Sequence, residues 1–270
     1  MHRSRSGRLW TGKFWIALVV LALALVAAVP AGASVPTQSK GPLKVGTNLP
    51  APGFWTGNTP KDIKGGFEYD LAQEIAKKLG YDGVEVVNVS FDALVAGKAS
   101  GFDLAFSQVT ITGARGKVVA FSTPYFDSDQ GVMVRTGTTI TDKNAKTIQW
   151  GVQTATTAQT YLKKTIKPTK KPRVYQETSQ AFAALQAKQV DAVMLDTAIV
   201  LQQAAASNGK FVVVGQYLTG EKYGAVLPKG SPILSQVNQA ITDLKNDGTI
   251  AKLAEQNLGG DPGKIPVLGG

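Results

Sequence analysis

Two groups of polar residues have side chains that could together bind a small zwitterion. The stretch Ser107–Arg115, Ser-Gln-Val-Thr-Ile-Thr-Gly-Ala-Arg, supplies hydroxyl groups and one fixed positive charge, and Asp196 supplies a negative charge. A guanidinium is a planar fork that matches a carboxylate, and an aspartate accepts hydrogen bonds from an ammonium group. The two groups would be complementary to a molecule that carries a carboxylate and an ammonium on one carbon, provided that the chain brings them to one cleft.

Each of these residues also has a structural explanation that the spacing leaves open. Arg115 could be an exposed residue that follows a capping threonine, and Asp196 could cap the helix predicted to begin at Thr197. Thr156 and Thr157 come at the start of another predicted helix. Its first N–H groups would favour an anion, or could simply be capped.

The elements that must position these residues alternate between strands and helices. The predicted strands are 43–46, 84–89, 103–106, 147–152, 173–175, 192–195 and 211–214, with further extended segments at 121–125, 131–134 and 223–227. The predicted helices are 68–79, 91–99, 156–164, 179–188, 197–206, 231–247 and 249–258. Such alternation favours α/β layers with mainly parallel sheets, here in two runs that suggest two lobes. Ligands of open α/β sheets bind beyond the carboxyl ends of strands, where Asp196 and the loop before Arg115 would lie.

The composition excludes several classes of chemistry. The chain has no cysteine, and its one histidine is His2. His2 lies in the N-terminal segment interpreted below as an export signal, so the mature protein would have no histidine. A Ser-His or Cys-His pair and a Cys/His zinc site are therefore excluded, although a carboxylate or lysine catalyst remains possible. Neither a phosphate-binding glycine loop nor an acidic cluster with calcium-loop spacing is present, so no cofactor is expected.

The first residues have the pattern of an export signal. Four basic residues precede the apolar run Phe14–Val29, and Ala31–Ala33 offers small residues for cleavage before Ser34. We therefore predict a signal peptide at 1–33, a linker at 34–42, and a mature protein in the periplasm or at the outer cell surface. An uncleaved anchor is the alternative. Cleavage would remove four of the 29 Lys and Arg residues and none of the 19 acidic ones, so the net charge would fall from +10 to +6.

Five lysines gather between positions 163 and 171, with prolines among them. No aromatic side chains alternate with them to stack on bases, so we interpret this stretch as a solvated loop and expect no binding to nucleic acid.

A series of short blocks in the order and spacing seen here resembles the family 3 extracytoplasmic solute-binding proteins, the amino-acid receptors of ABC importers. The blocks are Leu43–Thr47, Gly66–Ala72, Gly101–Leu104, Thr110–Arg115, Phe121–Tyr125, Gly151–Gln153, Thr156-Thr157, Ala184-Leu185, Val190–Val193, Asp196, Tyr223-Gly224 and Leu244–Thr249. They run through nearly the whole mature chain.

The resemblance implies an α/β protein with the two-lobed type II periplasmic-binding-protein-like fold, in which two crossover strands join the lobes. Lobe 1 would comprise 43–127 plus 221–260, lobe 2 would comprise 130–218, and 261–270 would form a C-terminal tail. The implied partners are an amino acid and a membrane permease, and the protein would be a monomer without enzymatic activity.

The resemblance also implies roles for individual residues. Arg115 would bind the α-carboxylate together with the backbone N–H of Thr157, and Asp196 would accept from the α-ammonium. Thr110 and Ser107 would contribute hydroxyl or carbonyl groups to the polar end of the ligand.

Further positions would surround the ligand side chain. These are Gln153, the aromatic candidates Phe54, Trp55 and Phe91, and Gln108, which replaces a residue that is usually small. Asn48 stands where receptors for cationic amino acids often have aspartate. A buried cation would need a countercharge, so we favour polar uncharged or small aliphatic ligands, while acidic ligands stay open.

Two other functions stay open on the same resemblance. The family includes cyclohexadienyl and arogenate dehydratases, in which a cleft carboxylate acts as a general acid. Glu68, Asp127 or Glu177 would be the candidates for that role here. A sensor domain held in the membrane by an uncleaved helix at Phe14–Val29 is the other alternative.

Overall fold

The structure, a computed structural model, describes residues 41–269, and these belong to one compact unit. The predicted signal peptide (1–33) and most of the predicted linker (34–42) lie outside the described residues. Within 41–269, none of the helices has both the length and the apolar character needed to cross a bilayer.

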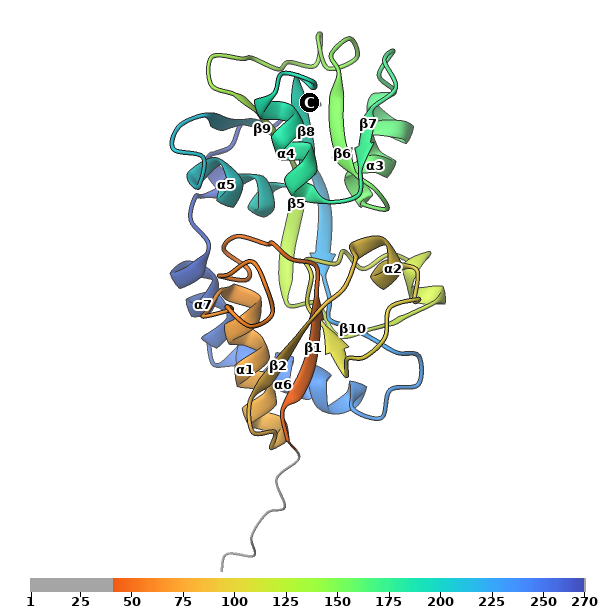
Figure 1. Ribbon diagram of the computed structural model, residues 1–270, viewed down its shortest axis with the longest axis vertical. Coiled ribbons are helices and arrows are strands. Elements are labelled where there is room, and N and C mark those ends of the chain that lie inside the picture. Colours follow the sequence, from red (N-terminus) through yellow and green to blue (C-terminus); the bar gives the residue numbers. More distant parts are fainter. Residues whose placement is uncertain (1–40, 270) are drawn as a thin grey trace, which may run out of the picture. The chain divides into compact units, whose positions relative to one another are not determined.

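The first of two five-stranded sheets is mixed. Across the sheet its strands are β2 (Val84–Asn88), β1 (Leu43–Thr47), β3 (Leu104–Ala105), β10 (Val226–Leu227) and β4 (Ala120–Phe121). β1 runs parallel to β2 and β3, whereas β10 is antiparallel to its neighbours. The associated helices are α1 (Phe67–Leu79), α2 (Phe91–Val95), α6 (Leu234–Asn246) and α7 (Thr249–Asn257), and Figure 1 shows α1, α6 and α7 grouped beside β1 and β2.

The amphipathic pattern of α1 explains its position. Leu71 and Ile75 recur one turn apart and are fully buried in the core beneath the first sheet, where the helix packs against α6 and α7. Gly80 ends the helix in the left-handed conformation, with φ of 75°, as the sequence predicts.

The second sheet contains the strands β7 (Arg173–Tyr175), β6 (Trp150–Gln153), β8 (Ala192–Asp196), β5 (Phe126–Arg135) and β9 (Phe211–Tyr223), in that order. β6 is parallel to β7 and β8, and β5 is antiparallel to β8 and β9. The helices α3 (Thr157–Tyr161), α4 (Thr178–Gln186) and α5 (Thr197–Ala205) accompany this sheet, and a π-helical turn, Leu162–Ile166, extends α3. The arrangement confirms the predicted α/β class with two mixed sheets.

β5 and β9 are much longer than the extended segments predicted from the sequence. They pair from Phe126–Tyr223 to Arg135–Phe211 and run through the middle of the unit toward the first sheet (Figure 1). Glycines and charged residues make the second half of β9, Gly215–Lys222, a poor strand former by itself. Antiparallel pairing with β5 overrides that propensity.

The segment after α7 passes from one hydrophobic core to the other. Leu258 packs against the core of the first sheet, whereas Ile265 and Leu268 pack against that of the second. The N–H of Gln216 on β9 donates to Pro266 O at 2.8 Å, and the N–H of Leu268 donates back to Gln216 O at 2.8 Å. The predicted tail is therefore a bound segment. The lobe boundaries themselves stay a prediction, because both sheets belong to one compact unit.

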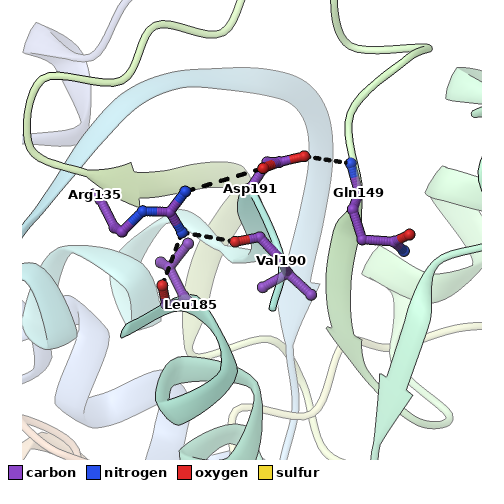
Figure 2. Close-up of polar contacts among 5 residues, drawn as sticks. All are labelled: Arg135, Gln149, Leu185, Val190 and Asp191. Atoms are coloured by element: carbon purple, nitrogen blue, oxygen red, sulfur yellow. Dashed lines mark hydrogen bonds and ion pairs between the residues drawn. The ribbon is translucent and has the colours of Figure 1, made fainter. Parts of the chain in front are cut away.

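The side chain of Arg135 joins the second sheet to α4, and its contacts are called the Arg135 clamp below. Figure 2 shows its guanidinium between the last turn of α4 and the start of β8, with Nη1 donating to Leu185 O at 2.8 Å and to Val190 O at 2.7 Å. The Asp191 carboxylate lies 3.9 Å away and accepts from the N–H of Gln149 at 2.8 Å, which ties in the strand β6. One cation thus satisfies carbonyl groups at the end of a helix and joins three strands to it.

Replacing Arg135 by methionine should lower the free energy of unfolding by about 2–3 kcal/mol, because two carbonyl groups lose a charged donor. Urea denaturation of the ligand-free protein measures the change. The matched control is Arg173→Met, since Arg173 is exposed on the edge strand β7. Equal effects of the two substitutions would show that the Arg135 clamp contributes nothing.

Candidate functional site

A pocket opens among the loops of both sheets, and its wall consists of hydroxyl, amide and aromatic side chains with two charged groups. Nine of the ten predicted site residues line it, namely Phe54, Phe91, Ser107, Gln108, Thr110, Arg115, Gln153, Thr157 and Asp196. The sequence reasoning did not assign a ligand contact to Pro50, Ala51, Pro52, Thr156, Thr178, Phe182, Leu195, Ile199 or Gln203, which also line it, and it used Asn48 only to argue about specificity. Trp55, the tenth predicted residue, is not among the lining residues.

Arg115 begins a short 3-10 helix, Arg115–Lys117, and its guanidinium is held in the pocket wall by neutral groups. Nη1 donates to Thr110 O at 2.7 Å and Nη2 donates to Ala155 O at 2.9 Å, while the guanidinium lies 5.4 Å from the ring centre of Phe91. Arg115 is 8% exposed, and no ion pair of the described residues includes it. Burial lowers the pKa of the guanidinium, which the charges of Asp196 and Glu221 oppose. A buried cation whose hydrogen bonds go only to neutral carbonyl groups would be stabilised by a bound anion.

Two residues of the site, Gln108 in the pocket wall and Ala155 beside Arg115, hold strained backbone conformations. Gln108 has φ of 48° and Ala155 has φ of 60°, both in the left-handed region that favours glycine. The Ala155 carbonyl is the acceptor for Arg115 Nη2, so the strained turn supplies a direct contact to the guanidinium. Strain of this kind costs about 1–3 kcal/mol per residue and concentrates at ligand sites.

Asp196 ends β8 and lies 5% exposed in the pocket wall. It occupies the N-cap position of α5, yet its side chain makes no capping hydrogen bond, so the capping alternative does not describe it. Instead Oδ1 accepts from Nε2 of Gln130 at 2.9 Å, and Gln130 lies directly opposite on the neighbouring strand β5. Burial, and after it the charge of Glu221, raises the pKa of Asp196 from 3.8 to about 7, although hydrogen bonds from Tyr223 and Gln130 and the charge of Arg115 lower it.

Glu221, which the sequence reasoning did not single out, lies behind the pocket wall. Its Oε2 accepts from the hydroxyl of Thr110 at 2.8 Å and from that of Thr157 at 2.7 Å, and its Oε1 accepts from Nε2 of Gln130 at 3.2 Å. Thr110 follows β3 of the first sheet, whereas Thr157 begins α3 beside the second. One carboxylate therefore binds hydroxyl groups from both halves of the site.

A second carboxylate, that of Glu68, organises the wall from inside α1, a role different from the general acid considered for it in the dehydratase alternative. It is fully buried and accepts from the Trp55 indole N–H at 2.8 Å, from the backbone N–H of Gln108 at 2.8 Å, and from the Tyr125 hydroxyl. The side-chain amide of Gln108 also donates to it. Burial raises the pKa of Glu68, which these hydrogen bonds oppose. The bond to Glu68 turns Trp55 toward the core instead of the pocket. The side-chain nitrogen of Gln108 is likewise engaged by Glu68.

The remaining predicted residues add uncharged groups to the pocket wall. Gln153 Nε2 donates to Asn48 Oδ1 at 3.2 Å, and the Ser107 hydroxyl accepts from the Asn48 N–H at 3.1 Å. Phe54 is 1% exposed and packs edge-to-face against Phe67. Thr178 and Gln203 are further neutral polar residues of the pocket wall.

The charges of the pocket define what it can bind. Of the described residues that line it, Arg115 and Asp196 are the only charged ones, and they have opposite signs. No three His, Cys, Asp or Glu side chains of the described segment lie close enough to hold a metal ion. The arrangement suits a small molecule that carries one anionic and one cationic group.

Comparison with known proteins agrees with this geometry and with the type II periplasmic-binding-protein-like fold. Residues 43–260 match the family described as "Bacterial extracellular solute-binding proteins, family 3", so the chain belongs to this family. The L-cystine-binding protein TcyJ of Escherichia coli (strain K12) is 30% identical over 201 residues, which cover 73% of this chain and 75% of that protein.

Solved structures resemble the whole described fold. "An ancestral arginine-binding protein bound to arginine" has a TM-score of 0.71 and 35% identity, covering 82% of this chain and 99% of that one. The "ancestral amino acid-binding protein AncCDT-1, a precursor of cyclohexadienyl dehydratase" has a TM-score of 0.69 and 30% identity, covering 81% and 96%. Relatives of this chain are thus amino-acid-binding proteins, among them proteins of ABC transporters.

The raised pKa of Asp196 predicts how stability depends on pH. Because the pKa is about 7 in the folded protein against an ordinary value of 3.8, the folded state binds more protons between these values. The stabilising contribution of this carboxyl is therefore present below about pH 4 and is lost as the pH rises through 7.

The substitution Asp196→Asn removes the buried charge and keeps an acceptor for Gln130. We expect the ligand-free variant to be more stable than the wild type by about 1–4 kcal/mol at pH 8, and this gain to shrink at pH 5. Chemical denaturation at both pH values measures it, with Asp127→Asn as control because the Asp127 side chain is 81% exposed. A gain that is the same at pH 5 and pH 8 would be inconsistent with a buried, titrating Asp196.

Proposed function

We propose that this chain is an extracytoplasmic receptor of an ABC importer that binds a free amino acid between its two sheets. The observation that carries the proposal is the pair of opposite charges in one pocket wall. Arg115 comes from the segment between β3 and β4 of the first sheet, and Asp196 from the end of β8 in the second. An α-carboxylate at Arg115 and an α-ammonium at Asp196 would neutralise both buried groups at once.

Binding would work by a shift between open and closed arrangements. A ligand favours the arrangement to which it binds more tightly, and here only a closed pocket would bring Arg115 and Asp196 to one molecule. The hydrogen bond from Arg115 to Ala155 O supports this reading, because Ala155 follows β6 of the second sheet. The same guanidinium that would bind the ligand thus already links the two halves.

The uncharged residues of the pocket wall support an amino acid whose side chain is polar and uncharged, or small and aliphatic. Asn48, Gln153, Thr178 and Gln203 offer amide and hydroxyl groups in the pocket wall. With Asp196 engaged by the α-ammonium, a cationic side chain would find no second carboxylate among the lining residues, and its desolvation would stay uncompensated. The names of the relatives give different ligands, cystine for one and arginine for another. We therefore infer the ligand class from the residues of this pocket.

The family membership supports the rest of the proposed role. The predicted signal peptide at 1–33 would direct the chain out of the cytoplasm, with cleavage near Ala33, and the closed monomer would deliver its ligand to a membrane permease. Nucleic acid has no place in this role.

The three carboxylates that the sequence offered for the dehydratase alternative are all placed outside the pocket. Glu68 has both carboxylate oxygens bonded inside the protein, Asp127 is on the surface in contact with Lys222, and Glu177 forms a capping box at the start of α4. None of the three lines the pocket. Incubation with prephenate or arogenate separates the alternatives, since turnover would support an enzyme and stoichiometric amino-acid binding without product supports a receptor.

Calorimetry and thermal denaturation with the twenty L-amino acids test the proposed function. At least one amino acid with an uncharged side chain should bind and raise the melting temperature. The substitution Arg115→Ala should weaken that binding by about 2–5 kcal/mol, or about 30-fold or more, because the carboxylate loses its charged partner.

The control for this substitution is Arg173→Ala, which removes an exposed arginine from β7. Both variants should fold, and only Arg115→Ala should lose the stabilisation by ligand. If wild-type protein binds no amino acid, the proposed function fails. If Arg115→Ala binds with unchanged affinity, Arg115 lies outside the binding site.

A further inference from the structure

Glu221 is bonded to two hydroxyl groups of the pocket without lining the pocket itself. Thr110 and Thr157 both line the pocket, and each donates its hydroxyl proton to Oε2 of Glu221, at 2.8 Å and 2.7 Å. A threonine hydroxyl has one proton and two lone pairs. Once the proton is engaged by the carboxylate, what each hydroxyl can still offer is a lone pair.

The amide of Gln130 completes this arrangement from the other side. Its Nε2 lies 3.2 Å from Oε1 of Glu221, 3.2 Å from the Thr157 hydroxyl and 2.9 Å from Oδ1 of Asp196. Gln130 is fully buried, and the three acceptors around Nε2 fix which end of its side-chain amide is the nitrogen. The Thr157 oxygen is therefore partly used as an acceptor, whereas the Thr110 oxygen keeps both lone pairs.

An irregularity in the pairing of β5 with β9 holds Glu221 in this position. Ser128 lies opposite Glu221, but Gln130 lies opposite Tyr217, so β9 carries extra residues at this point of its ladder with β5. The Asp129 carboxylate fills the irregularity by accepting from the N–H groups of Thr219 and Gly220, at 2.7 Å and 2.9 Å. Irregularities of this kind re-aim a side chain next to a ligand site.

We infer that Glu221 is a positioning residue that makes the ammonium end of the pocket select a protonated amine. It turns the hydroxyl of Thr110 into an acceptor, and the Gln130 amide links the same carboxylate to Asp196. This end would then offer lone pairs and negative charge, which suit an ammonium group and oppose a second carboxylate. An α-hydroxy acid has one proton to donate to these acceptors at its α-carbon, and an α-keto acid has none, whereas an ammonium group has three. The inference rests on the proposed function and deepens it, since it names what the site demands at the α-carbon.

The substitution Glu221→Gln tests this inference because it keeps the shape of the side chain. A glutamine has one acceptor oxygen and a donor nitrogen, whereas the site presents three donors from Thr110, Thr157 and Gln130. The charged acceptor of the two hydroxyl groups is then replaced by a neutral one, which holds their protons less tightly, so that a threonine proton can turn into the pocket. The probes are the twenty L-amino acids and, for the one that wild-type protein binds most tightly, the 2-hydroxy acid with the same side chain.

We expect wild-type protein to prefer the amino acid, and the ratio of the two dissociation constants to fall at least about tenfold in Glu221→Gln. A role in folding alone would weaken both ligands equally and leave the ratio unchanged. The control Glu85→Gln, at an exposed position of β2, should leave the ratio at its wild-type value.

A second variant shows whether Glu221 acts through the hydroxyl group. Thr110→Val removes that group and should also lower the ratio, and the double variant should then differ little from Thr110→Val alone. Additive effects would mean that Glu221 acts as a distant charge and would overturn the inference. Should Glu221→Gln fail to fold, an unchanged ratio in Thr110→Val overturns it equally.

These outcomes separate the two proposals. If no amino acid binds to the wild type, the proposed function fails and the inference falls with it. If an amino acid binds and the ratio stays constant in Glu221→Gln, only the inference fails.

Discussion

The site depends on two opposite charges that are buried near each other without forming an ion pair. Arg115 is held by carbonyl oxygens and an aromatic ring, and Asp196 by an amide and a phenol. Neutral partners keep each group in place and leave its charge uncompensated. A zwitterion that neutralises both groups would therefore recover much of the free energy that their burial costs.

Two further carboxylates make this arrangement possible. Glu68 ties the loop of Trp55, the strained turn at Gln108 and Tyr125 to one point inside α1. Glu221 joins the hydroxyl groups of Thr110 and Thr157 from the two halves of the site. Since neither of these carboxylates lines the pocket, the wall that faces the ligand keeps a single positive and a single negative charge.

The α/β fold could be predicted because its signals are local, whereas the roles proposed for Arg115 and Asp196 came from the resemblance to the family and not from their spacing. Leu71 and Ile75 recur with the helical period, and Asp196 follows a short apolar run at the end of a strand. Whether Asp196 caps its helix could not be decided from spacing, because a cap and a ligand contact require the same position. The structure shows a hydrogen bond to Gln130 and none to the helix.

What could not be predicted depends on contacts between distant segments. Glu221 lies in a stretch with poor strand propensity that becomes a strand by pairing with β5, and its direction is set by an irregularity that Asp129 stabilises. Phe54 and Trp55 are neighbours in the sequence, so their pattern cannot tell which of them faces the pocket. That choice follows from the bond between Trp55 and Glu68.

The most direct test of the central claim is a crystal structure of the protein with its amino-acid ligand. We expect the α-carboxylate in contact with the guanidinium of Arg115 and the α-ammonium within hydrogen-bonding distance of the Asp196 carboxylate, in one closed pocket. A ligand bound with these two groups reversed, or bound in a different cavity, would contradict it.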